Sequence, residues 1–433
     1  MPPAGSSCAL SRDSGAWRFA HLLRAPHRLA FAAGALLLAL SALWWAALQW
    51  AGAEAAPRAL PPSLVHGLLM SFGFMPLFFA GFLFTAGPKW LGRPAVPAAA
   101  LLPALLPMLA GWIVFLLAAH GRDEAFGRSL GAIGLSAVLL GWTGVLRRFG
   151  ALLSASEVND RLHARLVLAA GSLGAAAIGL AAWGIAAGEL TVVRAATQLG
   201  LWGFIGGVFV AAGHRMIPFF SGDAVPALAA WRPQWLLAGL LAVLGFEGLA
   251  GAAEALQLVS GRGWAAVRAA VELPAGLGLV ALAIHWRATR GARARLLVML
   301  HAGFSWLGVA LLLFGLSNAV AAALGEPSFI RLAALHAFTM GFLGTTMFTM
   351  VGRISTGHGG RIVAADDPAW RLFWLLQAAI VMRLAAALVA PLDAAWGQVL
   401  LTTAALAWAG ACIAWALRYG RWYGTPRPDG RAG

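Results

Sequence analysis

Two histidines occupy matching positions in two separate apolar segments of this chain. His66 lies in LVHGLLMSFGF and His336 in RLAALHAFTMGF, each a few residues after its segment begins. If both segments are helices that enter a bilayer from the same face, a rise of about 1.5 Å per residue places each imidazole roughly one turn below that face. Imidazoles at equal depth on separate helices suit a haem or another metal centre inside a bundle. Taken singly, each could instead be a hydrogen-bonded histidine near the membrane interface.

Five further histidines lie toward the other ends of their segments or in a following loop, namely His301, His214, His163, His285 and His358. His301, His214 and His358 are candidates for a second metal site on that side. A histidine at the end of a helix can equally cap the helix or extend toward the interface.

Charged residues inside apolar segments form the next group of candidates. Arg383 lies in AAIVMRLAAALVA, where an arginine at the centre of a bilayer costs at least about 2.5–3.5 kcal/mol. Counting along the helices places Glu247 at the same depth, so we expect an Arg383–Glu247 ion pair. Alternatively, Arg383 or Arg331 binds an anionic group such as a haem propionate. Glu254 follows Glu247 by seven residues on the same helical face, and the two carboxylates could pass protons or lie in a solvated crevice.

These residues require transmembrane helices to position them. Hydrophobic residues make up 61% of the 433 residues and charged residues 11%, well outside the range of soluble domains. Continuous apolar runs of about 20 residues predict an all-α polytopic bundle of about twelve transmembrane helices. The predicted spans are 29–50, 63–86, 95–119, 128–146, 166–188, 196–217, 235–257, 266–286, 296–323, 331–353, 370–391 and 396–417.

The basic residues follow this topology. The net charge is +15, but alternation of the twelve spans puts most of the 31 Lys and Arg residues on one face, as the positive-inside rule requires. We therefore expect a multi-pass membrane protein with both termini cytoplasmic, a lipid bilayer as its surroundings and no nucleic-acid partner. The arginines assigned to the outer side are Arg58, Arg122, Arg128, Arg194, Arg262, Arg268 and Arg331.

The connections are too short for a soluble domain. The expected organisation is a cytoplasmic N-terminal tail (1–28), a single transmembrane domain (29–417) and a cytoplasmic C-terminal tail (418–433). After the tenth span the chain reads VGRISTGHGGR, where Arg353 and Arg361 could bind an anion together with backbone N–H groups. The motif lacks the Lys-Ser/Thr ending of a phosphate-binding loop.

Several of these segments share their sequence with one family. They are HGLLMSFGFMPLFFAGFLFTAGPKWLG (66–92), GHRMIPFFS (213–221), LHAGFSWLG (300–308) and LHAFTMGFLGTTMFTMVGRISTGHGGR (335–361). Together they resemble the NnrS family, described as haem- and copper-containing bacterial membrane proteins of twelve helices linked to nitric-oxide metabolism and resistance to nitrosative stress. Some relatives carry HAHEM where this chain has HGLLM, so His66 is the one imidazole at that position.

A looser similarity connects the chain to the catalytic subunit of haem–copper oxidases. That subunit also has twelve helices, and histidines on its second and tenth helices hold a haem near the outer face. The copper ligands of the oxidases have no counterparts here. The only tyrosines, Tyr419 and Tyr423, lie near the C-terminus, so oxygen reduction of that kind is not expected.

The resemblance thus implies a b-type haem between the second and tenth spans, with His66 and His336 as axial ligands and Arg331 and Arg383 as propionate partners. It also implies copper, nitric oxide as a gaseous ligand and an electron donor. Two histidine ligands would favour electron transfer, and a single one would favour gas binding. Whether the protein catalyses a reaction stays open. The rival hypotheses are a secondary transporter and a non-enzymatic gas sensor or metal chaperone.

Overall fold

The computed structural model describes residues 15–52, 57, 59–221, 231, 233–288, 295–326 and 328–430. Within these residues twelve helices are long and apolar enough to cross a membrane, and no strand is present. The predicted all-α polytopic bundle is confirmed, and the chain is a multi-pass membrane protein.

Each predicted span corresponds to one helix or one stacked group of helices. The first, third, fourth and fifth spans are α2 (Pro26–Ala51, after the short α1, Phe19–Leu22), η3 with α5 (Ala98–Leu101, Leu102–Ala119), α6 (Glu124–Ser154) and α7 (Leu162–Ala187). The seventh, eighth, ninth, eleventh and twelfth are α11 (Gln234–Ala255), α12 (Gly261–Ala288), α13 (Arg295–Leu324), α16 (Asp367–Val389) and α17 (Ala394–Tyr423).

Several helices extend beyond their predicted apolar spans. The helix α6 continues to Ser154, and α17 continues to Tyr423, well into the segment assigned to the C-terminal tail. Apolar composition marks the part of a helix that lies in lipid, whereas arginine and leucine at the ends are good helix formers in water. Hydropathy therefore gave the lipid-facing length and not the helix length.

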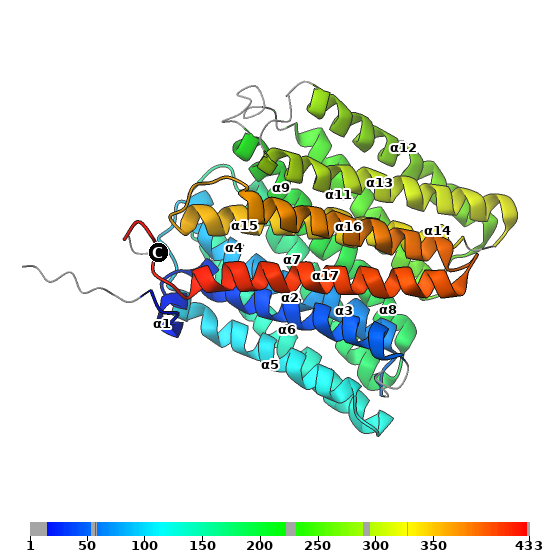
Figure 1. The fold of residues 1–433 in the computed structure, drawn as a ribbon, viewed down its shortest axis with the longest axis horizontal. Coiled ribbons are helices and arrows are strands. Elements are labelled where there is room, and N and C mark those ends of the chain that lie inside the picture. The colour runs from blue at the N-terminus through cyan, green and yellow to red at the C-terminus, as the bar shows by residue number, and fades with distance from the viewer. Residues whose placement is uncertain are drawn as a thin grey trace, which may run out of the picture.

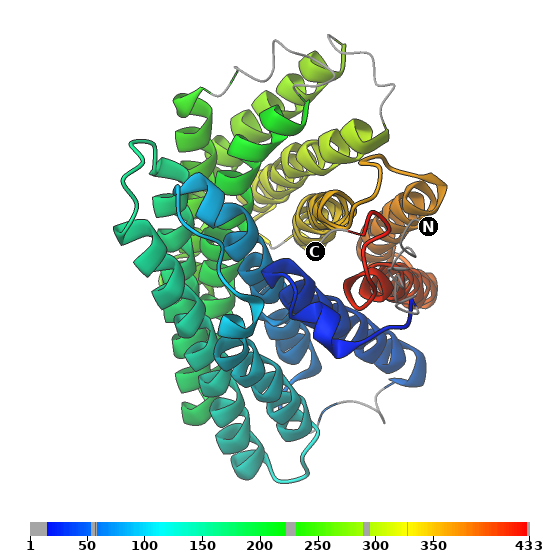
Figure 2. The ribbon, with the colours of Figure 1, turned by 90° about the vertical axis from the view of Figure 1, so that its left-hand side faces the viewer.

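The short helix α1 and the C-terminal end of α17 lie at the same end of the bundle, which we call the terminal end; the opposite end is the far end (Figures 1 and 2). The first and last membrane helices, α2 and α17, pack side by side. At the terminal end His21 Nδ1 lies 2.8 Å from the Gly424 carbonyl oxygen, and Arg28 donates to the Thr425 carbonyl at 2.9 Å. These bonds join the N-terminal segment to the C-terminal one.

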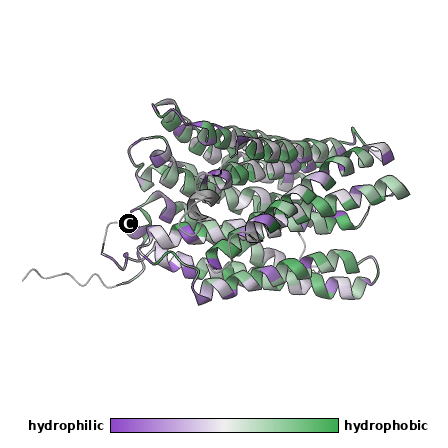
Figure 3. Ribbon diagram, turned by 90° about the horizontal axis from the view of Figure 1, so that it is seen from above, coloured by the Kyte–Doolittle hydropathy of each residue, from purple (hydrophilic) through white to green (hydrophobic). Residues whose placement is uncertain are grey.

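Polar residues gather at both ends of the bundle, and apolar residues cover most of its length (Figure 3). The second, sixth and tenth spans form its centre. Their most apolar windows are 89%, 78% and 78% buried, against no more than 56% in any other span. The remaining nine helices surround these three and face the lipid.

The three central spans share an irregularity. Each has a π-helical segment in its course: η2 (Leu69–Gly73) between α3 (Pro62–Leu68) and α4 (Met75–Trp90), η4 (Leu199–Gly206) between α8 (Leu190–Gln198) and α9 (Gly207–Ser221), and η5 (Ala337–Gly344) between α14 (Ile330–His336) and α15 (Thr345–His358). Such segments are rare and occur often at functional sites. Periodicity in the sequence did not predict them.

Aromatic rings pack the three central spans against one another. Trp202 of η4 stacks on Phe338 of η5 with ring centroids 3.8 Å apart. Phe79 of α4 contacts Phe204 of η4 at 5.7 Å, edge to face. A Cβ atom at Gly200 would lie 2.1 Å from the Phe72 ring, so the second and sixth spans approach as closely as a glycine permits. The centre is thus rigid, and it fixes the helices that carry His66 and His336.

Candidate functional site

His66 and His336 occupy equivalent places in the second and tenth spans. His66 is four residues after Pro62, where α3 begins, and His336 is six residues after Ile330, where α14 begins. At about 1.5 Å per residue both lie roughly 6–9 Å from the far end of their helices. The π-helical segment starts three residues after His66 and directly after His336. The matching depth predicted from the sequence is therefore a property of the fold.

Arg383 joins the two histidines. It lies six residues before Val389, where α16 ends at the far end, and so at roughly the same depth of 9 Å. Its guanidinium is close enough to act electrostatically on both imidazoles, and His66 acts on His336 in the same way. We call these three residues the histidine–arginine site. The structure brings them together from the second, tenth and eleventh spans.

The two imidazoles are held differently. His66 stacks on Trp45 of α2, with ring centroids 4.0 Å apart and an interplanar angle of 28°, and no described residue forms a hydrogen bond with its Nδ1. His336 Nδ1 lies 2.9 Å from the Leu332 carbonyl oxygen. Because a carbonyl only accepts, that nitrogen carries the proton, and Nε2 keeps its lone pair.

This arrangement meets the requirements of an axial haem ligand. A backbone carbonyl that accepts from one ring nitrogen is the usual way in which a metal-binding histidine is oriented. Both imidazoles are surrounded by protein, yet both retain accessible surface. A haem needs only two protein ligands, because the porphyrin supplies the other four. In their donor chemistry, His66 and His336 are therefore suited to hold a haem iron.

The expected Arg383–Glu247 ion pair is wrong. Glu247 instead pairs with Arg268 of α12, and no described residue forms a hydrogen bond or ion pair with Arg383. Equal depth is necessary for two side chains to meet, but it does not show whether the helices that carry them are adjacent. The helix α11 packs on α8, η4 and α12, whereas α16 packs on α14, α15 and α17.

Arg331 also has a partner within the protein. It donates to Glu254 Oε2, which Arg268 contacts through the other carboxylate oxygen at 2.8 Å. Arg383 is therefore better placed than Arg331 to bind an anionic group beside the two histidines.

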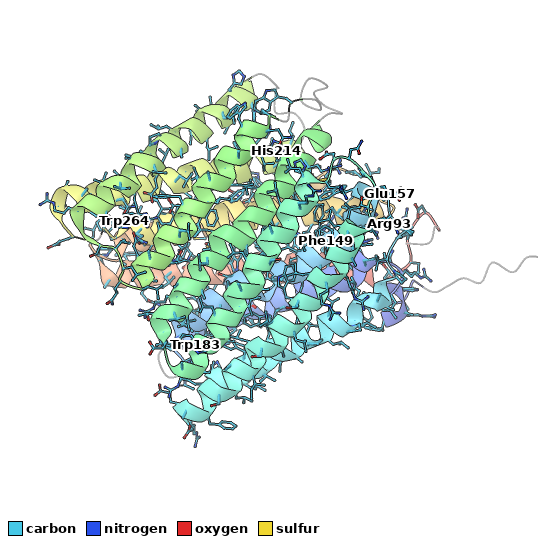
Figure 4. The ribbon with its side chains drawn as sticks, turned by 180° about the vertical axis from the view of Figure 1, so that it is seen from behind. Arg93, Phe149, Glu157, Trp183, His214 and Trp264 are labelled. Carbon is cyan, nitrogen blue, oxygen red and sulfur yellow. The ribbon has the colours of Figure 1, made fainter. Side chains whose placement is uncertain are left out.

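Of the five histidines expected toward the terminal end, the structure brings His214 and His163 together, whereas His301 and His358 have other neighbours. His214, labelled in Figure 4, lies against His163, with His214 Nδ1 and His163 Nε2 3.1 Å apart. It also lines a cavity of about 60 Å³. His358 lies beside His27 of α2, with ring centroids 5.0 Å apart, and His301 lies near the Trp286 ring. In the part of the chain that the structure describes, no group of three or more His, Cys, Asp or Glu could hold a metal ion.

The motif that closes the tenth span packs against the C-terminal helix. The Arg361 guanidinium lies 4.1 Å from the centroid of the Trp422 ring, and Ser355 Oγ lies 2.6 Å from the Tyr423 hydroxyl. Arg353 is half-buried within α15. These contacts give the motif a structural role at the terminal end, far from the histidine–arginine site.

Sequence reasoning missed Trp45 at the site and Arg268 elsewhere at the far end. Trp45 carried no signal, because its stacking on His66 depends on how α2 packs. Arg268 was assigned to the outer side but is 1% exposed inside α12.

The fold and this site define a class: a membrane protein with twelve helices of membrane length among its described residues, a histidine pair on two of the central spans and, on an adjacent helix, an arginine with no hydrogen-bond or ion-pair partner among those residues. The family model described as NnrS protein matches residues 21–427. The match covers nearly the whole chain, and the chain therefore belongs to the NnrS family. No curated protein matches it.

Proposed function

We propose that the protein binds a b-type haem at the histidine–arginine site and acts on nitric oxide at the bacterial inner membrane, in the manner expected of the NnrS family. The observation that carries the proposal is the joint placement of His66, His336 and Arg383 at one depth on three helices.

Each residue of the histidine–arginine site would have a distinct role. His66 and His336 would hold the iron from the second and tenth spans, and the Leu332 carbonyl fixes the His336 ring. Arg383 would neutralise a propionate, since a guanidinium and a carboxylate form strong charge-assisted hydrogen bonds. Haem iron supplies reversible one-electron chemistry and binds nitric oxide. The rigid aromatic centre keeps the distance between the ligand helices constant.

Orientation in the membrane follows from the basic residues. The terminal end carries most of the Lys and Arg, so we place both termini in the cytoplasm. The histidine–arginine site would then lie near the outer face, where an electron donor and a dissolved gas can reach it. The resemblance also implies copper, for which we assign no ligands.

The proposal is tested on the full chain, expressed with haem supplied and purified in mild detergent. We expect iron at one equivalent per chain and a reduced-minus-oxidised spectrum of a b-type haem. If His66 and His336 both hold the iron, nitric oxide would have to take the place of one of the two imidazoles. The observed binding rate should therefore become independent of nitric-oxide concentration once the gas is in excess.

Copper is measured on the same sample. A rate that stays proportional to nitric-oxide concentration would show that one axial position is open, contradicting the two-ligand arrangement. Folded protein without iron would overturn the haem proposal altogether and favour the transporter hypothesis.

A further inference from the structure

A second buried polar cluster lies at the far end, between α11, α12, α13 and α14. It contains three glutamates and two arginines, and we call it the far-end charge cluster. Its members are Glu247, Glu254, Arg268, Glu272 and Arg331, together with the amide of Asn318. Trp264, which donates to Glu254 at 2.9 Å, marks this end of the bundle in Figure 4.

Arg268 is the centre of the cluster. Its Nε and Nη2 lie 2.9 and 2.8 Å from Glu272 Oε1, and its Nη1 lies 2.8 Å from Glu254 Oε1. Its remaining contact is with Glu247 Oε2. Arg268, Glu247 and Glu272 are each no more than 1% exposed, so their charges must be balanced within the protein.

The cluster is not neutral when all its members are ionised. Three carboxylates against two guanidinium groups leave one negative charge, in a region too apolar to tolerate it. Moreover, the carboxyls of Glu247 and Glu272 are close neighbours, and adjacent buried carboxylates disfavour ionisation of both. One bound cation removes both difficulties, and a proton is the cation that a carboxylate oxygen can take without a further ligand set.

The hydrogen bonds identify which carboxylate is protonated. Both oxygens of Glu272 accept: Oε1 from Arg268 and Oε2 from Asn318 Nδ2 at 2.7 Å. Both oxygens of Glu254 accept as well, from Arg268 and Arg331. Glu247 Oε2 accepts from Arg268, but no described residue donates to its Oε1. Of the three, Glu247 alone has an oxygen to spare for a proton.

A cavity connects Glu247 with the surface at the far end. It has a volume of about 290 Å³, enough for several water molecules. Glu247, Arg268 and Gln198 line it inside the bundle, and Ser328 and Arg331 line it where α14 begins. The Arg331 side chain is 42% exposed, so the cavity reaches solvent. Water in it can bring a proton to Glu247.

We propose that Glu247 is a reversible proton-binding site that exchanges protons with the aqueous phase at the far end through this cavity. The charged groups that face it are Arg268 and Glu272 of α12, with Glu254 on its own helix and Arg331 of α14 beyond them. In this arrangement Arg268 fixes the carboxyl group, and Glu272 supplies the negative charge that keeps the proton bound. The proposal does not depend on the haem.

The test is infrared spectroscopy of the full-length protein in detergent, in H₂O and in D₂O. We expect a carboxylic-acid C=O band that shifts in D₂O, disappears in Glu247→Gln and persists in the control Glu189→Gln. Glu189 is an exposed carboxylate at the same end. Absence of the band in the wild type, or its survival in Glu247→Gln, would overturn the proposal.

Thermal stability gives an independent readout. Glutamine has the shape and charge of a protonated glutamic acid, so Glu247→Gln should unfold at the wild-type temperature. Glu272→Gln removes a charge that Arg268 needs and should unfold several degrees lower. Equal losses in the two variants would contradict the assignment of the proton to Glu247. A wild-type melting temperature that depends on sodium at fixed pH and ionic strength would show that a metal cation occupies the cluster instead.

Discussion

Replacement of Arg268 with methionine is expected to destabilise the protein by about 3–5 kcal/mol, the usual cost of removing one partner from a buried ion pair. Methionine fills much of the same volume, so packing is largely kept. What is lost is the cation that balances Glu272 and fixes the carboxyl group of Glu247. Glu272 would then have to take up a proton or remain charged in an apolar region. The free energy of unfolding in mixed micelles with increasing denaturant measures the loss.

Neutralising the carboxyls should recover most of that stability. In the triple variant Arg268→Met, Glu247→Gln, Glu272→Gln, no uncompensated charge remains among these three positions, so its stability should lie well above that of Arg268→Met alone. A matched control is Arg262→Met, because Arg262 bonds only to backbone carbonyls near the exposed end of α13. If Arg262→Met were as damaging as Arg268→Met, the buried ion pairs would not explain the effect.

Replacement of Arg383 with methionine should have opposite effects on stability and on haem content. No described residue pairs with Arg383, and an arginine at the centre of a membrane helix costs at least about 2.5–3.5 kcal/mol. The haem-free variant should therefore be more stable than the haem-free wild type. With haem supplied, the variant should retain less of it, because the positive charge beside His66 and His336 is gone.

Both quantities are measured on the same preparations, by thermal unfolding and by the haem absorbance per chain. Arg383→Lys separates the contributions of charge and shape, because lysine keeps the charge but not the planar guanidinium. Its haem content should therefore lie between those of the wild type and Arg383→Met. A haem-free Arg383→Met protein that is less stable than the wild type would show that Arg383 supports the fold and has no need of a bound anion.

The sequence predicted the helices and the depth of their polar residues well. It predicted poorly which helices are adjacent. Apolar runs of membrane length and the distribution of basic residues were sufficient for twelve spans. A histidine's distance from the end of its helix follows from the helical rise alone, so the match between His66 and His336 was predictable. The pairing of Arg383 with Glu247 was not, since it depended on which helices are adjacent.

The same limit explains the residues that were missed. Arg268 and Glu272 are four residues apart on one helix, a spacing that brings side chains together. That spacing inside an apolar span was a visible sign of a buried pair, but counting Arg268 among the outer loops concealed it. The π-helical segments η2, η4 and η5 were missed as well, because such a short change of helical register inside an apolar span leaves composition and hydropathy unchanged.

The central claim is that His66 and His336 together hold one haem. It is tested most directly by the haem absorbance per chain of His66→Ala and His336→Ala, beside the control His285→Ala, an exposed histidine at the terminal end. The account predicts that each site variant loses most of its haem or shows a shifted reduced-minus-oxidised spectrum, while the control matches the wild type. Wild-type haem content and spectra in both site variants would contradict it.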